Sequence, residues 1–264
     1  MKTETININK ENLSYLDNKK GDITLLFIHG SFINKEYWNN QLPYFSKNYR
    51  VIAIDIAGHG NSSQNRQEWS IQNYGKDISE FIKSLSLKRV ILIGHSIGAD
   101  IMLETITNNP KNIIGLIGID YFKNVGNELP QNIINQIVAN LKSDFSNTCA
   151  EYAKQALLSK ETEPELTEKI TLAFREVNPK VGISLNENTF NYTQRETELL
   201  KELPIKIHLI NVNYLPTNEV NLKEYIDGKY ELHTLNGTCH YPMLENPNDF
   251  NISLEKVLSK IKAN

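Results

Sequence analysis

Short runs of apolar residues recur along the chain, and each run ends in a polar or glycine-rich segment. The runs are residues 23–28, 49–54, 90–93, 113–119, 205–210 and 229–235. A continuous apolar run of this length predicts a strand that is covered on both faces, as in a parallel sheet. Residues 1–22 are more polar and alternate weakly, so they predict one or two strands at the edge of that sheet.

Helical spacing of apolar residues separates these runs. Residues 71–85 carry apolar side chains at 71, 74, 78, 81, 82 and 85, which predicts an amphipathic helix. Residues 35–44 indicate a short helix and loop, and residues 248–261 a last amphipathic helix. Strands that alternate with helices favour βαβ units, and therefore a mostly parallel central sheet flanked by helices.

The pattern changes over residues 121–200. Apolar positions mark helical faces near 133–141, 150–157 and 166–174, and no strand-like run interrupts them. We therefore predict an inserted helical cap at 121–200 on an α/β core formed by residues 1–120 and 201–264.

Composition narrows the possible roles. The chain has 264 residues, of which 40% are hydrophobic and 22% charged, enough for one α/β domain with an insertion. A net charge of −3 provides no basic surface for nucleic acid or a membrane. We expect no signal peptide, because no apolar segment follows the amino terminus, and no membrane span, because no run approaches about 18 residues. Two cysteines, Cys149 and Cys239, are too few for a disulfide framework and favour the cytoplasm.

The most informative stretch for chemistry is 90–98, Val-Ile-Leu-Ile-Gly-His-Ser-Ile-Gly. A Gly-x-Ser-x-Gly motif between a predicted strand and a predicted helix is typical of a nucleophile elbow. Gly94 and Gly98 remove Cβ atoms where strand and helix crowd each other, so Ser96 can stand on a strained turn. The alternative interpretation is a glycine-containing turn with an ordinary serine.

Three more distinctive segments also follow predicted strands. They are residues 29–32 (His-Gly-Ser-Phe), 211–213 (Asn-Val-Asn) and 237–247 (Gly-Thr-Cys-His-Tyr-Pro-Met-Leu-Glu-Asn-Pro). Parallel sheets bind ligands at the carboxyl ends of their strands. The segments are therefore expected to meet the elbow at one edge of the sheet.

Taken in order, four motifs resemble those of the α/β-hydrolase superfamily, in particular its small capped esterase-like members. They are His29-Gly30, Asp55-x-x-Gly58-His59-Gly60-x-Ser62, Gly94-His95-Ser96-Ile97-Gly98 and His240-Tyr-Pro-Met-Leu-Glu-Asn-Pro. The resemblance spans nearly the whole chain outside the cap and implies an α/β-hydrolase fold.

That resemblance also assigns roles. It implies that Ser96 is the nucleophile and His240 the general base. The oxyanion hole would consist of the backbone N–H groups of Ile97 and Ser31. Asp55 is expected to fix the turn at 58–60 rather than to take part in catalysis.

The acidic member of the triad is less clear. Related hydrolases carry Asp where this chain has Asn213, and an amide brings no charge to stabilise an imidazolium. Asp120 ends the preceding predicted strand, where some members, haloalkane dehalogenases among them, keep their acid. Asp120 could instead be a structural aspartate that caps the start of the insertion. We hypothesise that Asp120 orients His240, with Asn213 as a nearby neutral partner and as the alternative third member.

Substrate contacts are expected from Phe32, His95, Tyr121 and Phe122, around an apolar pocket for a small acyl substrate. The spacing of His59, His208 and His233 does not suggest metal ligands, so we expect no metal and no cofactor. We expect a monomer or homodimer.

The resulting prediction is a serine hydrolase that cleaves a small carboxylic ester or thioester through an acyl-enzyme intermediate. The same site could cleave a C–C bond, a lactone or an amide, since fold-level analogy does not choose among them. A slow-turnover ligand receptor or signalling protein of this fold is a third possibility, and the neutral Asn213 is the feature that supports it.

Overall fold

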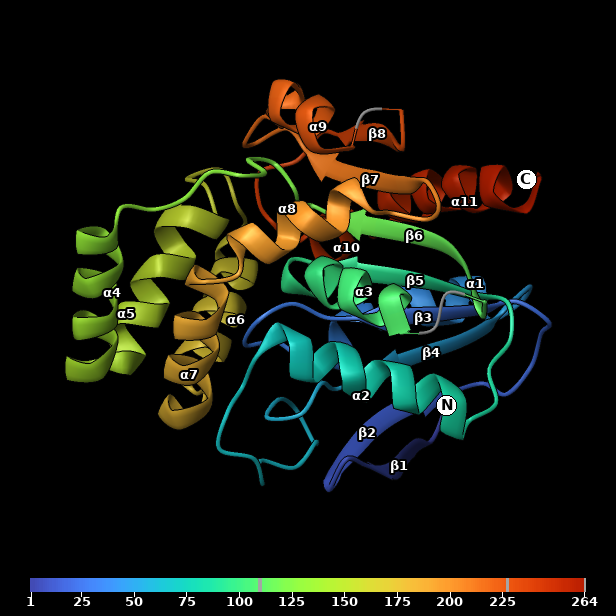
Figure 1. The fold of residues 1–264 in the computed structure, drawn as a ribbon, viewed down its shortest axis with the longest axis horizontal. Coiled ribbons are helices and arrows are strands. Elements are labelled where there is room, and N and C mark those ends of the chain that lie inside the picture. The colour runs from blue at the N-terminus through green and yellow to red at the C-terminus, as the bar shows by residue number, and fades with distance from the viewer. Residues whose placement is uncertain (109–110, 227, 264) are drawn as a thin grey trace.

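The computed structural model describes residues 1–108, 111–226 and 228–263, and it contains an eight-stranded sheet in the order β1-β2-β4-β3-β5-β6-β7-β8 (Figure 1). The strands are β1 (Thr3–Ile8), β2 (Glu11–Asp17), β3 (Thr24–Ile28), β4 (Arg50–Ile54), β5 (Val90–His95), β6 (Ile113–Ile119), β7 (Ile207–Val212) and β8 (Tyr230–Leu235). The hairpin of β1 and β2 joins antiparallel to β4, and the other neighbouring strands are parallel. The predicted mostly parallel sheet is confirmed, and residues 1–22 supply the edge strand β1 and its neighbour β2.

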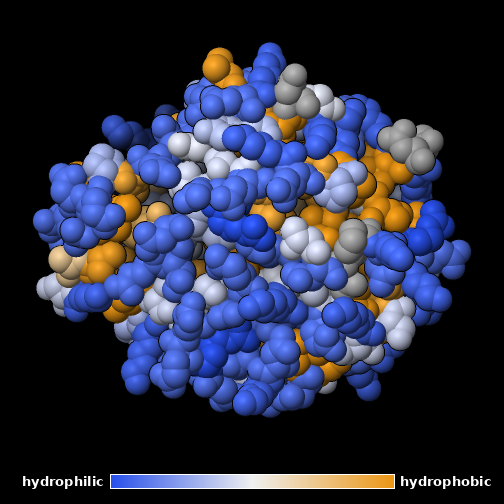
Figure 2. Space-filling view, viewed as in Figure 1, coloured by the Kyte–Doolittle hydropathy of each residue, from blue (hydrophilic) through white to orange (hydrophobic). Residues whose placement is uncertain are grey.

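Burial explains why the central strands lack polar alternation. Every residue of β3, β5 and β7 is buried, because helices cover both faces of the sheet. One layer holds α2 (Ile71–Ser84), α3 (Ile97–Asn108) and α8 (Thr193–Lys201), and Figure 1 shows them on the near face. The opposite layer holds α1 (Gln41–Phe45), α10 (Pro242–Glu245) and α11 (Pro247–Ala263), with the 3₁₀ turn Lys35–Trp38 preceding α1. Figure 2 shows that the solvent-exposed surface on this face is mainly hydrophilic, as expected of amphipathic helices.

The segment between β6 and β7 is helical. It contains α4 (Gln131–Ser143), α5 (Phe145–Tyr152), a π-helical turn η2 (Ala153–Leu157), α6 (Pro164–Arg175), α7 (Pro179–Phe190) and α8. The apolar spacing predicts α4, α6 and the α5–η2 segment, but α7, α8 and the short α9 (Glu219–Ile226) lack an equally clear pattern. The predicted cap includes α8, but α8 packs on α3 of the predicted core. The cap boundaries at residues 121 and 200 therefore stay a prediction. Within the described residues, no helix combines the length and apolar character needed to cross a membrane.

The turn from β5 to α3 is the tightest junction of the sheet. A Cβ atom on Gly94 would lie 2.2 Å from the carbonyl oxygen of Gly98, and one on Gly98 would lie 2.6 Å from that of Ile28. Between them Ser96 has a φ of 56°, in the left-handed region that a serine rarely adopts. Two glycines therefore let the helix start directly against the sheet, and the serine takes the strained position at its tip.

We predict that Gly94→Ala lowers the free energy of unfolding by about 3 kcal/mol, because the added methyl group would overlap the backbone of α3. Gly118→Ala is the matched control, since Gly118 lies opposite Gly94 in β6. There the new methyl group would lie 3.0 Å from the flexible end of Leu209 and at an ordinary contact distance of 3.7 Å from the ring of Phe122, and we expect a loss of about 1 kcal/mol or less. Urea unfolding of both variants measures the difference, and equal losses would contradict the argument.

Candidate active site

Ser96 stands between the end of β5 and the first turn of α3, and its side chain is partly exposed. The N–H of Ile97 is one of the first amides of α3, which have no acceptor within the helix. Gly30 lies directly beside the serine, since a Cβ atom on Gly30 would be 2.8 Å from Cβ of Ser96. The elbow and the loop after β3 therefore share one small region at the edge of the sheet, as expected.

The loop after β3 is held by the buried His29. Its Nε2 accepts the N–H of Ile56 at 3.1 Å, so Nδ1 carries the proton and donates to the carbonyl of Gly30 at 2.7 Å. Burial lowers the pKa of His29, which keeps this ring neutral. Ser31 follows on this fixed backbone and is partly exposed. Its place in an oxyanion hole stays a prediction.

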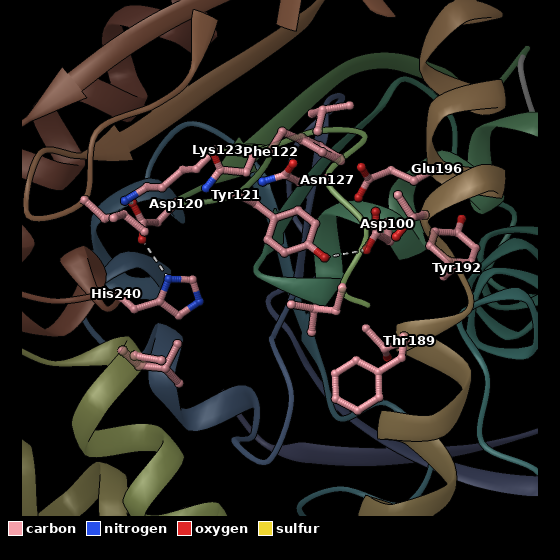
Figure 3. A pocket seen from close by; sticks show the side chains of 18 of the residues that line it. Asp100, Asp120, Tyr121, Phe122, Lys123, Asn127, Thr189, Tyr192, Glu196 and His240 are labelled. Carbon is pink, nitrogen blue, oxygen red and sulfur yellow. Dashed lines mark hydrogen bonds and ion pairs between the residues drawn. The ribbon is translucent and has the colours of Figure 1, made fainter. Parts of the chain in front are cut away.

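His240 is oriented by Asp120, with 2.7 Å between Nδ1 of the ring and Oδ2 of the carboxylate (Figure 3). Because the carboxylate accepts, Nδ1 donates the proton and Nε2 keeps its lone pair. Nε2 is buried, and none of the described residues gives it a hydrogen-bond partner. The backbone of His240 is also held: its N–H donates to Leu157 in η2 at 2.8 Å, and its carbonyl accepts from Nε2 of His95 at 2.8 Å.

The Asp120 carboxylate gathers donors from three parts of the chain. Besides His240, its Oδ1 accepts the N–H of Val212 at 2.7 Å and the ammonium group of Lys123 at 2.7 Å. Lys123 is buried, which lowers its pKa, and it also donates to the carbonyl of Val212 at 2.8 Å. Sequence reasoning did not identify Lys123, although its place three residues after Asp120 was the available signal.

Asn213, the alternative third member, does not serve His240. Its side chain is exposed, its amide NH₂ donates to Asn236 at 2.8 Å, and its oxygen accepts the N–H of Gly237 at 3.1 Å. Both ends of the amide thus tie the loops after β7 and β8 together. The expectation that Asn213 is a neutral partner of His240 is therefore corrected: in this structure the residue is a loop brace.

Asp55 is a structural carboxylate. It forms a buried ion pair with Lys35 at 2.6 Å and accepts the N–H of Asn61 at 2.9 Å. A Cβ atom on Gly60 would lie 2.4 Å from this carboxylate, so only glycine fits there. These contacts fix the turn at 58–60, and they leave Asp120 as the carboxylate beside His240.

A cavity of about 400 Å³ opens beside the histidine. Its walls come from α3, the loop after β6, the cap helices and the loop after β7 (Figure 3). Of the predicted site residues, those that line it are Asp120, Tyr121, Phe122 and His240. Those that do not are Ser31, Phe32, His95, Ser96, Ile97 and Asn213. The cavity therefore borders His240 and Asp120 and extends under the helical insertion, and the elbow residues Ser96 and Ile97 are not part of its wall.

Two of the predicted substrate contacts lie elsewhere. His95 is only 1% exposed and packs between His240 and Trp38, with 4.5 Å between the two histidine ring centres. Phe32 packs edge-on against Phe174 of the cap. Burial leaves the ring of His95 no surface for a substrate, and we assign it to supporting the backbone of His240.

One cluster of possible metal ligands lies far from the elbow in sequence, on β7 and β8. His208 and Glu231 pair across the two strands, and His233 follows on the same face of β8. Their ligand atoms lie within 4.8 Å of one another. However, the ammonium group of Lys260 already contacts the carboxylate of Glu231, so a cation would have to displace it. The expected absence of a metal stays a prediction.

Comparisons with known proteins agree with the fold described above. A family model described as alpha/beta hydrolase fold matches residues 23–168. A strigolactone esterase of Pisum sativum is 24% identical over 253 residues, which cover 91% of this chain and 94% of the relative. An (E)-2-((N-methylformamido)methylene)succinate hydrolase of Acinetobacter baylyi is 36% identical over 91 residues, about a third of its length. A solved structure of a thermophilic esterase from Thermogutta terrifontis superimposes with a TM-score of 0.84 at 18% identity, covering 99% of both chains.

We predict that Asp120→Asn slows labelling of Ser96 by a fluorophosphonate on the order of 10⁴-fold, since the amide cannot stabilise an imidazolium. Asn213→Ala is the matched control and should label at the wild-type rate, because Asn213 braces loops only. Labelling is followed by mass spectrometry at several reagent concentrations. Full reactivity of Asp120→Asn, or an equal loss in Asn213→Ala, would contradict this assignment.

Proposed function

Because the chain belongs to the alpha/beta hydrolase family, we propose that it is a serine hydrolase that cleaves a small carboxylic ester or thioester through an acyl-enzyme intermediate. One observation carries the proposal. Asp120 holds Nδ1 of His240, and the other ring nitrogen, at the wall of the cavity, has no hydrogen-bond partner among the residues that the structure describes.

In the proposed first step, Oγ of Ser96 attacks the carbonyl carbon of the ester, and Nε2 of His240 takes the serine proton. Asp120 stabilises the resulting imidazolium through Nδ1. The N–H groups of Ile97 and Ser31 would bind the oxyanion, and one such donor typically contributes about 10²–10³ in rate. His240 then gives its proton to the departing alcohol or thiol, leaving Ser96 acylated.

Deacylation repeats the sequence with water as the nucleophile. His240 takes a proton from the water, the tetrahedral oxyanion forms again, and collapse returns the proton to Ser96 and releases the carboxylic acid. Lys123 contributes by holding Asp120: its ammonium group engages Oδ1, so that Oδ2 remains directed at the histidine.

The size of the cavity supports a small substrate. A volume of about 400 Å³ lies at the lower end of ligand pockets. Phe122, Leu157 and Phe190 give it apolar walls close to the polar reacting centre.

The main argument for a receptor-like protein with very slow turnover does not hold in this structure. That interpretation depends on a neutral residue in place of the acid, whereas here Asp120 occupies the position beside His240. We therefore favour multiple turnovers.

We predict that the protein turns over p-nitrophenyl esters of acetate to hexanoate, and that Ser96→Ala and His240→Ala each lower kcat by on the order of 10⁴ or more. The assay follows p-nitrophenol release at substrate excess. Thr197→Ala, on α8 and outside the cavity wall, is the control with unchanged turnover. A single burst without further turnover would instead favour the receptor-like alternative, and activity in Ser96→Ala would contradict the nucleophile.

A further inference from the structure

Two acidic residues line the side of the cavity opposite His240. Asp100 projects from the first turn of α3, and Glu196 from α8, which packs on it (Figure 3). Asp100 is 1% exposed, and it stands four residues after Ser96. Nothing in the proposed ester chemistry uses either carboxyl group.

The hydrogen bonds of Asp100 are incomplete. Its Oδ2 accepts the hydroxyl of Tyr121 at 2.7 Å, whereas its buried Oδ1 receives no N–H or hydroxyl donor from the described residues. The carboxyl group of Asp100 instead interacts with that of Glu196, so two acceptors face each other. Burial and the neighbouring Glu196 raise the pKa of Asp100 well above its usual range. Burial likewise raises the pKa of Glu196 to about 7. The two groups therefore share a site that disfavours a second negative charge.

Nearby cations do not neutralise this pair. Arg195, beside Glu196 on α8, directs its guanidinium to Glu104 at 3.1 Å and to Glu198 at 3.8 Å. Lys123 also lines the cavity, but its ammonium group is engaged by Asp120. Within the described part of the chain, no ion pair to Asp100 or Glu196 occurs.

A buried carboxylate without a cation is costly, and an unfilled acceptor in a cavity wall is best satisfied by a ligand. We infer that Asp100 and Glu196 bind a primary ammonium group on the substrate, so that the preferred esters carry an amine at the end away from the reacting carbonyl. The inference rests on the proposed ester hydrolysis and specifies its substrate class. An ammonium group can donate to Oδ1 of Asp100 and to Glu196 at once, which a hydroxyl or an alkyl end cannot.

Helix geometry sets the reach. Four residues of α-helix rise about 6 Å, so the carboxylate of Asp100 lies roughly one turn beyond Ser96. A chain of a few methylene groups between carbonyl and nitrogen spans such a distance. The amine could belong to the acyl part or to the alcohol part of the ester, and both arrangements are tested.

The experiment compares matched pairs of esters by pH-stat titration. One series pairs methyl ω-aminoalkanoates of increasing length with methyl alkanoates, and the other pairs acetate esters of primary ω-amino alcohols with alkyl acetates. We expect the cationic member of at least one pair to have a kcat/KM about 10- to 100-fold higher, as for a hydrogen bond to a charged group. Equal or higher kcat/KM for the uncharged members in both series would overturn the inference.

Variants identify the residues responsible. Asp100→Asn and Glu196→Gln should each remove most of the preference for the cationic ester while retaining hydrolysis of the uncharged one. Glu198→Gln is the matched control, because it removes one carboxylate of α8 that does not line the cavity. If both Asp100→Asn and Glu196→Gln kept the preference for the cationic ester, the assignment would be contradicted. Because Glu196 is partly exposed, we expect Glu196→Gln to leave folding intact.

Equilibrium binding separates this inference from the proposed function. Hexylammonium and hexanol are titrated by calorimetry into the Ser96→Ala protein, whose fold keeps the cavity but lacks the nucleophile. Tighter binding of hexylammonium that disappears with Asp100→Asn supports the ammonium site even if no ester is hydrolysed. Ester hydrolysis without selective binding of hexylammonium would contradict the ammonium site but would leave the proposed function supported.

Discussion

The site depends on the contacts that the carboxylate of Asp120 makes. It accepts the ring N–H of His240, the ammonium group of Lys123 and the backbone N–H of Val212, so one side chain connects the ends of β6 and β7 with the loop after β8. A buried carboxylate with three donors is satisfied, whereas an unpaired one would be costly. The same contacts that stabilise the charge also fix the tautomer of the histidine.

Ser96 and Asp100 show how one helix serves two purposes. The strained turn before α3 presents the serine, and the first turn of the same helix presents a carboxyl group to the cavity. Backbone strain at the serine persists because Gly94 and Gly98 let strand and helix meet at contact distance. Rigid elements thus position both groups, which favours accurate geometry over a loop-based arrangement.

Several features were predictable from sequence for clear physical reasons. Buried parallel strands cannot alternate, so their apolar runs stand out, and the glycine spacing around Ser96 reports a steric need that no other residue meets. The sequence favoured Asp120 over Asn213 as the partner of His240 but left Asn213 as an alternative, because both residues follow adjacent strands at the same edge of the sheet. Side-chain direction decided it, and direction depends on a φ of 49° at Asp120 that the sequence does not reveal.

Contacts between segments that are distant in the sequence could not be predicted from the sequence either. Asp100 and Glu196 meet only because α8 packs on α3, and the weak apolar pattern of α8 did not predict that packing. His208 and Glu231 come together through the register of β7 and β8, which chain spacing does not encode.

The hydrogen bond from the N–H of His240 to the carbonyl of Leu157 makes the π-helical turn η2 part of the machinery. A chimaera that exchanges the whole helical insertion to alter the substrate range would therefore also replace the acceptor that holds the His240 loop. If the graft replaced residues 153–157, the histidine loop would lose its acceptor unless the incoming segment offered a carbonyl at the same place. A splice that keeps this turn and changes only the helices around it preserves the anchorage of the loop.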